Sequence, residues 1–483
     1  MNEMKHLSLL TDFYQLTMMN GYLQNDMTDE IVVFDLFFRE NPCHSGYTII
    51  AGIEQVIDYI ENLKFHEDEL SYLASLGTFK EDFIDALRNF KFSGTIYGVA
   101  EGTVMFPHEP ILRVKGTCFE TQLIETALLN VMNHQSLIAT KAARIVTAAK
   151  GDPVFEFGLR RAQGPDAGVY GARAAVIGGC SSTSNVLAGM KFDLTVVGTQ
   201  AHSWIQKFPT ELESFRAYAK AYPDDCLLLV DTYNTLEAGV PNAITVFNEL
   251  RTQGHKPKGI RIDSGDIAYL SKQARRMLDE AGFPDAIIVA SSDLDEDTIS
   301  ALKDQKAEIN GWGVGTNLIT SKNCPALGGV YKLSAAEEDG ELVPKIKISN
   351  NPEKITNPGF KNVYRIYDVK TGKAQADLIA LDDEVIDEDQ PLTIFHPVYT
   401  WKQTTFTDYR LKKLLQPIFI DGELVYQRQT TQQIKDKVSK ELDSLWPEYR
   451  RLTRPQIYKV DLSEALWQLK QDLVNENKVF PKK

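Results

Sequence analysis

The feature of this 483-residue chain that most constrains its fold is an alternation of short apolar runs with amphipathic segments through its middle third. Runs such as Leu227–Asp231 and Ala286–Ser291 are largely apolar on both faces, as the strands of a buried parallel sheet are. The other runs lie at Val154–Gly158, Leu194–Gly198, Gly259–Asp263 and Ile309–Gly315. The segments between them have helical spacing, which indicates repeated βα units. The pattern predicts a TIM-like α/β barrel, irregular because eight clean strands are not visible, with a doubly wound open sheet as the alternative.

The regions on either side of this middle third differ from it in pattern, and the chain length favours two or three domains. Residues 1–135 mix short strands with helices and predict an N-terminal mixed α/β domain. Within it, Thr117 and Glu120 have capping-box spacing at the start of a long helix. Residues 336–483 predict a C-terminal α/β extension, which leaves 136–335 for the barrel and the active site.

Polar residues and glycines follow nearly every apolar run of the middle third, at the carboxyl end of the expected strand. These residues are Arg160, Arg161, Thr199, His202, Asp231, Arg261, Asp263, Asp266, Ser291, Ser292, Gly313, Gly315 and Thr316. In parallel α/β folds, ligands bind at the carboxyl ends of the strands. A single such group could be a turn, but their succession along the chain predicts one active site that binds anions and moves protons.

His202 is one of eight histidines, and a lone histidine is more often a surface or core residue than a functional one. No two histidines lie within five positions of each other, so the sequence contains no local metal motif. His202 nevertheless follows Gly198-Thr199 at a strand end, within reach of the other strand ends. An ordinary histidine pKa of about 6.5 suits a nucleophile or an acid–base group, so we predict a catalytic role.

Two carboxylate-bearing segments each allow a structural and a functional interpretation. Asp231 either caps the helix that follows it, or orients His202 or helps to bind a metal, and both interpretations stay open. Arg261 suits a phosphate or carboxylate, and Asp263 and Asp266 suit Mg²⁺ on a diphosphate. An ion pair with a helix cap is the structural alternative. We favour the functional interpretation because both kinds of charge share one strand end.

Glycines and aromatic residues add weaker signals. Gly311–Thr316 is not a Walker loop, but its backbone N–H groups and Thr316 could bind a 5′-phosphate, whereas a tight turn is the structural alternative. Tyr14 lies well before the barrel and Phe157 lies within its first run. Aromatic residues in such places are more often core than ligand contacts, and the residues alone do not pair these two.

Charge and cysteine content limit the partners and the location. The net charge is −14, which disfavours binding to nucleic acid or to an anionic membrane, so an anionic substrate needs local cations. The five scattered cysteines, without a C-x-x-C motif, fit reduced thiols rather than a disulfide framework. No signal peptide or membrane-spanning run is visible, and a cytoplasmic location is expected.

Seven stretches together resemble the nicotinate phosphoribosyltransferase family, in its longer bacterial form with a C-terminal extension. They are Leu10–Met18, Glu156–Pro165, Val197–Trp204, Ile262–Asp266, Gly313–Thr316, Gly329–Lys332 and Lys354–Gly359. The resemblance implies a type II phosphoribosyltransferase-like fold and a homodimer with shared active sites. It implies that nicotinate and 5-phosphoribosyl-1-diphosphate give nicotinate mononucleotide and diphosphate, in NAD biosynthesis. The reaction would be coupled to ATP hydrolysis and use Mg²⁺ on the diphosphate.

The resemblance also implies roles for individual residues. His202 would be phosphorylated by ATP, with Asp231 beside it, while Tyr14 of the partner subunit and Phe157 would sandwich the pyridine ring. Thr199 and Arg261 would contact nicotinate or the ribose. The phosphoribosyl group would be held by the other matched positions, which are Arg160, Asp263, Gly315, Thr316 and Lys332. Such a site would stabilise positive charge at the sugar C1 and the departing diphosphate.

One position departs from the family pattern, and several rival functions stay open. Asn234 stands where the family is associated with a second aspartate, so we assign it no catalytic role. Nicotinamide is a close alternative base, because acid and amide can be distinguished by one contact. A barrel aldolase would need a strand-end lysine and a metal-dependent hydrolase would need clustered histidines, and neither is found. A ligand-sensing protein without enzyme activity would release no diphosphate.

Overall fold

The computed structural model describes residues 6–351, 354–399 and 401–477, and the chain forms two compact units. The first unit contains Met1–Leu137, Ala326–Gln429 and Asp436–Lys483, and the second contains Ile138–Pro325 and Thr430–Lys435. The two flanking regions of the chain therefore pack as one unit. The division into three domains, with boundaries near 135 and 335, stays a prediction.

The second unit is built on a six-stranded sheet in the order β7-β6-β11-β10-β9-β8, and all of its strand pairs are parallel. The strands are β6 (Val154–Glu156), β7 (Ser182–Thr183), β8 (Leu227–Leu229), β9 (Gly259–Ile262), β10 (Ile287–Ser291) and β11 (Gly311–Val314). The side chains of β8 and β11 are buried throughout, as expected for strands covered on both faces. The predicted parallel sheet is confirmed, and no strand pair among the described residues closes it.

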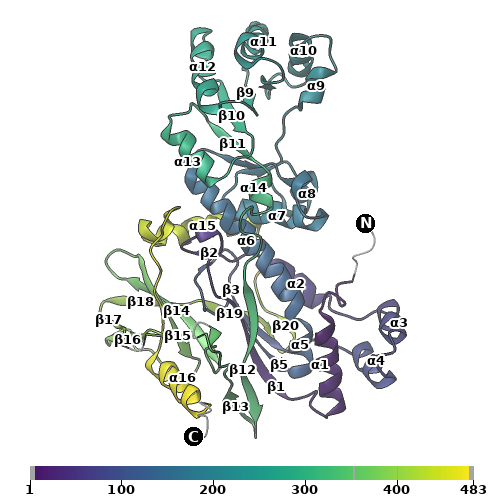
Figure 1. Ribbon diagram of the computed structural model, residues 1–483, viewed down its shortest axis with the longest axis vertical. Helices are drawn as coiled ribbons and strands as arrows, with labels where there is room; N and C mark the ends of the chain where they lie inside the picture. The colour runs from purple at the N-terminus through teal and green to yellow at the C-terminus, as the bar shows by residue number, and fades with distance from the viewer. Residues whose placement is uncertain (1–5, 352–353, 400, 478–483) are drawn as a thin grey trace. The chain divides into compact units, whose positions relative to one another are not determined.

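Helices follow these strands and cover the sheet, and Figure 1 shows α12 beside β9 and β10. They are α7 (Pro165–Ile177), α8 (Val186–Phe192), α9 (His202–Gln206), α10 (Glu211–Ala221), α11 (Val240–Thr252), α12 (Ile267–Glu280), α13 (Glu296–Asp304) and α14 (Thr316–Ile319). A short π-helix, Thr235–Gly239, precedes α11, and a 3₁₀ turn, Leu159–Arg161, precedes α7. The βα alternation places the strand ends together at one edge of the sheet.

The structure differs from the sequence-based expectations in two local features. The run Leu194–Gly198 forms only a single parallel bridge, between Thr183 and Val196, rather than a full strand. The long helix is divided at Ile124 into α5 (Cys118–Leu123) and α6 (Glu125–Ala149). Its cap at Thr117 is confirmed, but the Glu120 carboxylate accepts from Ser93 and does not complete a capping box.

The first unit contains a seven-stranded sheet in the order β13-β12-β1-β5-β3-β19-β20 and a two-stranded sheet, β2-β4. Their strands are β1 (Ile31–Phe38), β2 (Thr48–Ile49), β3 (Thr95–Val99), β4 (Val104–Met105), β5 (Leu112–Thr117), β12 (Gly329–Glu338), β13 (Glu341–Pro344), β19 (Leu415–Ile420) and β20 (Glu423–Leu424). Strand β12 pairs with β1 and strand β19 with β3, both antiparallel. These pairings between distant segments join the two flanking regions of the chain into one unit.

A second, six-stranded sheet of this unit has the order β17-β16-β21-β15-β14-β18. Its strands are β14 (Lys361–Asp368), β15 (Ala374–Leu381), β16 (Leu392–Phe395), β17 (Gln403–Phe406), β18 (Tyr409–Lys413) and β21 (Val460–Leu462). The described helices of the unit include α1 (Phe13–Gln24), α2 (Ile53–Glu61), α3 (Glu67–Ser75), α4 (Glu81–Arg88) and α16 (Glu464–Glu476). Helix α15 (Thr431–Ser444) begins in the second unit and belongs to the first from Asp436 onward. Arg365 is fully buried here and donates to Asp377, to Glu441 and to the carbonyl of Val104. These bonds tie β14 to β4.

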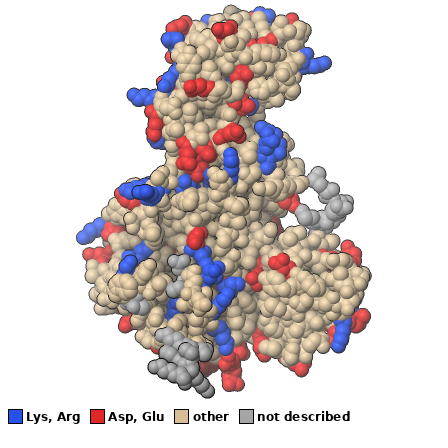
Figure 2. All heavy atoms as spheres, in the orientation of Figure 1, with Lys and Arg blue, Asp and Glu red and all other residues tan. Residues whose placement is uncertain are grey.

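Charged side chains of both signs are mixed over the visible face of the molecule (Figure 2). In the part of the chain that the structure describes, no helix combines the length and apolar character that a membrane crossing requires. All five cysteines lie within the described ranges, and none of them forms a disulfide bond. The predictions about nucleic acid, membranes and location stay predictions.

Candidate active site

Arg261, near the end of β9, is held by two other segments and by Asp263, which follows its own strand. Its Nε donates to Ser291 Oγ at 2.8 Å and its Nη1 donates to Thr199 Oγ1 at 2.8 Å. Nη1 also approaches the carbonyl of Gln200 at 3.4 Å, and Nη2 donates to Asp263 Oδ1 at 2.9 Å. The structure therefore brings together three predicted site residues, Thr199, Arg261 and Asp263. Four of the five N–H groups of the guanidinium are used within the protein.

Asp231 and Asp263 lie at neighbouring strand ends and are linked through the backbone. Asp231 Oδ2 accepts from the Asp263 N–H at 3.1 Å and from Ser264 Oγ at 2.5 Å. Asp231 Oδ1 is buried without a hydrogen-bond partner. Burial disfavours the ionised form of Asp263, but hydrogen bonds from Ser291 and Arg261 outweigh this and hold its pKa below the ordinary value. Asp231 thus supports Asp263 and does not cap a helix.

His202 begins α9 and is partly exposed. Its Nδ1 lies 3.0 Å from Thr232 Oγ1, and its Nε2 lies 3.8 Å from Asp263 Oδ2. Asp231, for which orientation of this ring was one of the open interpretations, makes neither of these contacts. Asn234 caps the π-helix by accepting from the Glu237 N–H at 3.0 Å, which is a structural role.

Phe157 lies next to the glycines of β11. Its N–H donates to the Val314 carbonyl at 2.8 Å. A Cβ on Gly313 would lie 2.8 Å from two ring atoms of Phe157, and one on Gly315 would lie 3.2 Å from its carbonyl oxygen. The glycines therefore make room for the Phe157 ring, in addition to any role in binding phosphate.

Glu156, just before this ring, is fully buried and was not singled out from the sequence. It accepts from the Gly158 N–H and from Thr183 Oγ1, the latter at 2.5 Å. Burial raises the pKa of Glu156, and these hydrogen bonds and Arg160 oppose the rise. Arg160 is exposed and its Nη1 donates to the Phe157 carbonyl at 3.3 Å. Glu156 thus fixes the turn that carries Phe157 and Arg160.

The remaining site residues of the second unit occupy helix starts. Gly315 precedes α14 and Thr316 is its first residue, both of them partly buried. Asp266 caps α12, because its Oδ1 accepts from the Tyr269 N–H at 3.0 Å. The structural interpretation of Asp266 is therefore correct, and its second oxygen remains available to a ligand.

Tyr14 and Lys332 belong to the first unit. Tyr14, on α1, is 49% exposed, and burial and the charge of Glu125 raise its pKa. Lys332, on β12, is partly buried; burial lowers its pKa, which Glu125 partly offsets.

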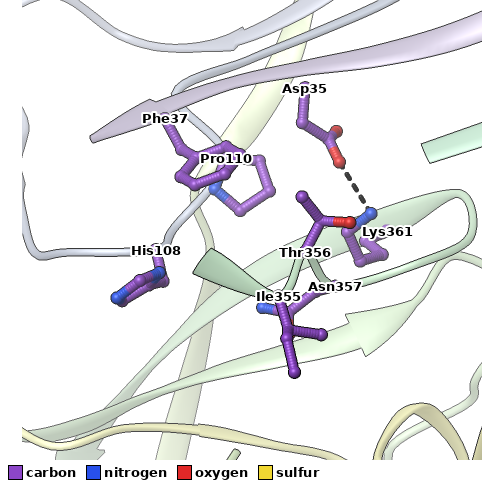
Figure 3. Close-up of a pocket in the computed structure, with 8 residues that line it drawn as sticks. All are labelled: Asp35, Phe37, His108, Pro110, Ile355, Thr356, Asn357 and Lys361. Atoms are coloured by element: carbon purple, nitrogen blue, oxygen red, sulfur yellow. Dashed lines mark ion pairs between the residues drawn. The ribbon is translucent and has the colours of Figure 1, made fainter. Parts of the chain in front are cut away.

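A small pocket, with a volume of about 10 Å³, lies in the first unit (Figure 3). It is lined by Asp35, Phe37, His108, Pro110, Ile355, Thr356, Asn357 and Lys361. The buried Lys361 Nζ lies 2.6 Å from Asp35 Oδ2, and Figure 3 shows this pair across one side of the pocket. Burial, with Lys470 and Arg39 nearby, lowers the pKa of His108 to about 4, so its ring is neutral at neutral pH. None of the predicted site residues lines this pocket.

The residues suited to Mg²⁺ are carboxylates of the second unit. The partnerless Asp231 Oδ1 and the Asp263 Oδ2 are oxygen ligands of the kind that Mg²⁺ prefers. Among the described residues, no group of three or more histidine, cysteine, aspartate or glutamate side chains could hold a metal alone. This arrangement fits an ion that takes most of its ligands from substrate phosphates and water.

Together, an aromatic ring, a fixed guanidinium and two carboxylates at the carboxyl edge of a parallel sheet define an α/β enzyme for an anionic substrate. Three family models match: the nicotinate phosphoribosyltransferase N-terminal domain at residues 9–133, the nicotinate phosphoribosyltransferase family at 153–377 and the C-terminal domain at 360–470. The chain belongs to the nicotinate phosphoribosyltransferase family.

Individual relatives agree with this assignment over nearly the whole chain. The nicotinate phosphoribosyltransferase of Bacillus subtilis is 49% identical over 472 residues, covering 98% of this chain and 96% of the relative. That of Caenorhabditis elegans is 38% identical over 530 residues, covering 97% and 93%. The crystal structure of human nicotinic acid phosphoribosyltransferase has a TM-score of 0.84 and 29% identity, covering 96% of this chain and 100% of that one. The aldolase and hydrolase alternatives lose their basis.

Proposed function

We propose that the protein transfers the phosphoribosyl group of 5-phosphoribosyl-1-diphosphate to nicotinate, giving nicotinate mononucleotide and diphosphate for NAD biosynthesis. The observation that carries this proposal is the hydrogen-bonded ring of Arg261, Ser291 and Asp263 at the carboxyl ends of the strands. Phe157 lies at the same edge of the sheet, where its N–H donates to the Val314 carbonyl at the end of β11. The Arg261 guanidinium would bind the carboxylate of nicotinate, and the Asp263 carboxylate would stabilise positive charge on the sugar. The family assignment supports the same reaction.

The base would lie against Phe157, with its carboxylate near Thr199 and Arg261. Because four N–H groups of Arg261 are used within the protein, the guanidinium offers one free N–H rather than a bidentate fork. The Thr199 hydroxyl hydrogen makes only a 3.4 Å contact, to the Gln200 carbonyl, and can supply a second bond. A carboxylate satisfies two such donors, whereas the NH₂ group of nicotinamide would face a donor. This arrangement favours the acid over the amide.

The sugar and diphosphate would occupy the strand ends beside this network. Asp231 and Asp263 would stabilise positive charge at the sugar C1, and their free oxygens would face Mg²⁺ together with Asp266. Bound Mg²⁺ would supply charge neutralisation for the leaving diphosphate. The remaining contacts to the phosphoribosyl group would come from Arg160, Gly315, Thr316 and Lys332.

Coupling to ATP would pass through His202. Its ring is held at Nδ1 by Thr232 and faces Asp263 with Nε2, so both nitrogens lie at the strand-end site. Phosphorylation there would add about two negative charges near the diphosphate position and alter the affinity for substrates and products.

A homodimer would complete the site. Phe13, Tyr14 and Met18 on α1 are exposed apolar or aromatic side chains, with exposed fractions of 51%, 49% and 39%. Such a surface fits burial against a second copy of this chain. Tyr14 of one subunit would then stack on the base held by Phe157 of the other.

The parallel sheet would form an irregular barrel. Its first and last strands, β6 and β11, are paired, as they are in a barrel. Segment 194–200 bridges to β7 through Thr183–Val196, and Gln200 Nε2 donates to the Leu227 carbonyl of β8 at 3.3 Å. This segment would therefore close the gap between β7 and β8.

The deciding experiment is diphosphate release by purified enzyme from 5-phosphoribosyl-1-diphosphate with nicotinate or nicotinamide, with and without ATP. We expect release with nicotinate, stimulation by ATP and a strong preference for nicotinate when both bases compete. Preference for nicotinamide would overturn the substrate assignment. Absence of release with either base would overturn the reaction.

A further inference from the structure

We propose that Ser291 is a positioning residue that commits one carboxylate oxygen of Asp263 to the protein and leaves the other for the reacting groups. The inference rests on the proposed function of the site. The sequence pattern places Ser291 only among the polar strand-end residues, and the family resemblance gives it no individual role. The geometry around Asp263 points to this one.

Ser291 closes a hydrogen-bonded ring with Arg261 and Asp263. Arg261 Nε donates to Ser291 Oγ at 2.8 Å, and the serine hydroxyl donates to Asp263 Oδ1. Arg261 Nη2 donates to the same Oδ1 at 2.9 Å. Both bonds therefore converge on one oxygen, and the hydroxyl accepts from the cation while it donates to the anion.

The second oxygen, Oδ2, is left to the centre of the site. His202 Nε2 lies 3.8 Å from it, which is beyond hydrogen-bond length. The Asp263 backbone is fixed separately, because its N–H donates to Asp231 Oδ2 at 3.1 Å. Removing the serine hydroxyl would leave the backbone in place and leave Arg261 Nη2 as the one donor of the ring on Oδ1, so the carboxylate would be less firmly oriented.

The position of Ser291 on the sheet suits this role. It is the last residue of β10, is 4% exposed and lies opposite Gly313 of β11. A Cβ on Gly313 would lie 3.3 Å from the Ser291 Cβ, so the glycine leaves space for the serine as well as for Phe157. The next residue, Ser292, has a φ of 126°, a strained value that turns the chain away directly after Ser291.

The charges around Asp263 agree with this division of its two oxygens. The charged or titratable groups that face Asp263 are Arg261, His202 and Asp231. The hydrogen bonds from Ser291 and Arg261 favour the ionised carboxylate against the cost of burial. Loss of the serine hydroxyl should therefore weaken the stabilisation of positive charge that develops at the sugar C1, more than it weakens substrate binding.

The test is steady-state kinetics of Ser291→Ala with 5-phosphoribosyl-1-diphosphate varied at saturating nicotinate and Mg²⁺. We expect kcat to fall about tenfold with KM nearly unchanged, because Asp263 acts on charge that develops in the transition state. Ser291→Cys, a weaker donor, should lose less. In an Asp263→Asn background, Ser291→Ala should cause no further change.

Ser271→Ala is the matched control. Ser271 is fully buried in α12, and its hydroxyl donates to the Ala268 carbonyl and accepts from the Glu308 N–H, both at 3.2 Å. It should lose thermal stability and keep the wild-type kcat. A wild-type kcat in folded Ser291→Ala, an equal loss in the control, or a full further loss in the Asp263→Asn background would overturn the role of Ser291. An inactive wild-type enzyme would instead overturn the proposed function, and the orientation of the Asp263 carboxylate in a crystal structure of Ser291→Ala would still decide the inference.

Discussion

Replacing Gly313 by alanine should impair nicotinate binding through Phe157. The new Cβ would lie 2.8 Å from Cδ2 and Cε2 of the Phe157 ring, whereas carbon atoms in contact pack at about 3.5–4.0 Å. The ring must therefore move by roughly 1 Å, and a displacement of that size in an orienting group can cost about 100-fold in rate. We expect kcat/KM for nicotinate to fall about 10- to 100-fold.

The stability cost of the same change should be small. Overpacking costs about 1–3 kcal/mol, and replacing a strand glycine returns about 0.5–1 kcal/mol, so a net loss of roughly 1 kcal/mol is expected. Gly311→Ala, on the same strand, is the matched control, because its Cβ would lie 2.9 Å from the Phe155 ring instead. The centroids of the stacked Phe155 and Phe157 rings lie 6.0 Å apart, so Gly311→Ala would disturb Phe157 only indirectly. We therefore expect a smaller loss of kcat/KM in the control.

The assay is steady-state diphosphate release with nicotinate varied at fixed 5-phosphoribosyl-1-diphosphate, together with urea unfolding of both variants. If Gly313→Ala and Gly311→Ala lose nicotinate kcat/KM equally, Phe157 is not the surface on which the base lies. A loss of stability without a kinetic difference would lead to the same conclusion.

Three further predictions follow from individual side chains. His202→Ala should lose ATP stimulation of diphosphate release but keep slow ATP-independent transfer; ATP acceleration of the variant would rule out the coupling role. Burial and the charge of Asp377 raise the pKa of Glu109, so its stabilising contribution is complete below about pH 4.3 and is lost as pH rises through the raised pKa. Glu109→Gln should therefore flatten the decline of the unfolding free energy with rising pH, as urea titrations can show; a wild-type slope would contradict this. Asp266→Asn should keep the α12 cap, and hence stability within about 0.5 kcal/mol, but raise the Mg²⁺ concentration for half-maximal activity about tenfold. An unchanged Mg²⁺ titration would remove Asp266 from the metal site.

Local pattern was sufficient for five of the six strands of the parallel sheet and for several site residues, but it missed β7 and predicted a full strand at Leu194–Gly198 where a single bridge forms. Runs such as Leu227–Asp231 are largely apolar at consecutive positions, which indicates a strand buried on both faces. The residue that follows a parallel strand lies at the ligand-binding edge of the sheet because of the geometry of the fold. Thr199, Arg261 and Asp263 were therefore predictable as neighbours. The chemistry of Asp266 was ambiguous, because a carboxylate at a helix start serves equally as a cap.

Contacts between distant segments were decided only by the tertiary structure. Ser291 lies 30 residues from Arg261, and Glu156 lies 27 residues from Thr183, so no local periodicity reports their hydrogen bonds. Serine is common at strand ends, and its role depends on which groups the fold places opposite it. The residue pattern likewise did not show that Gly313 makes room for Phe157.

The sequence by itself determined the family, the order of strands and helices in the middle third, and which residue types stand at the strand ends. The tertiary structure decided how the two flanking regions combine, through the pairing of β12 with β1 and β19 with β3. It also decided which oxygen of Asp263 remains free. Both outcomes depend on hydrogen bonds between segments far apart in the chain, which are set by three-dimensional geometry rather than by neighbours in sequence.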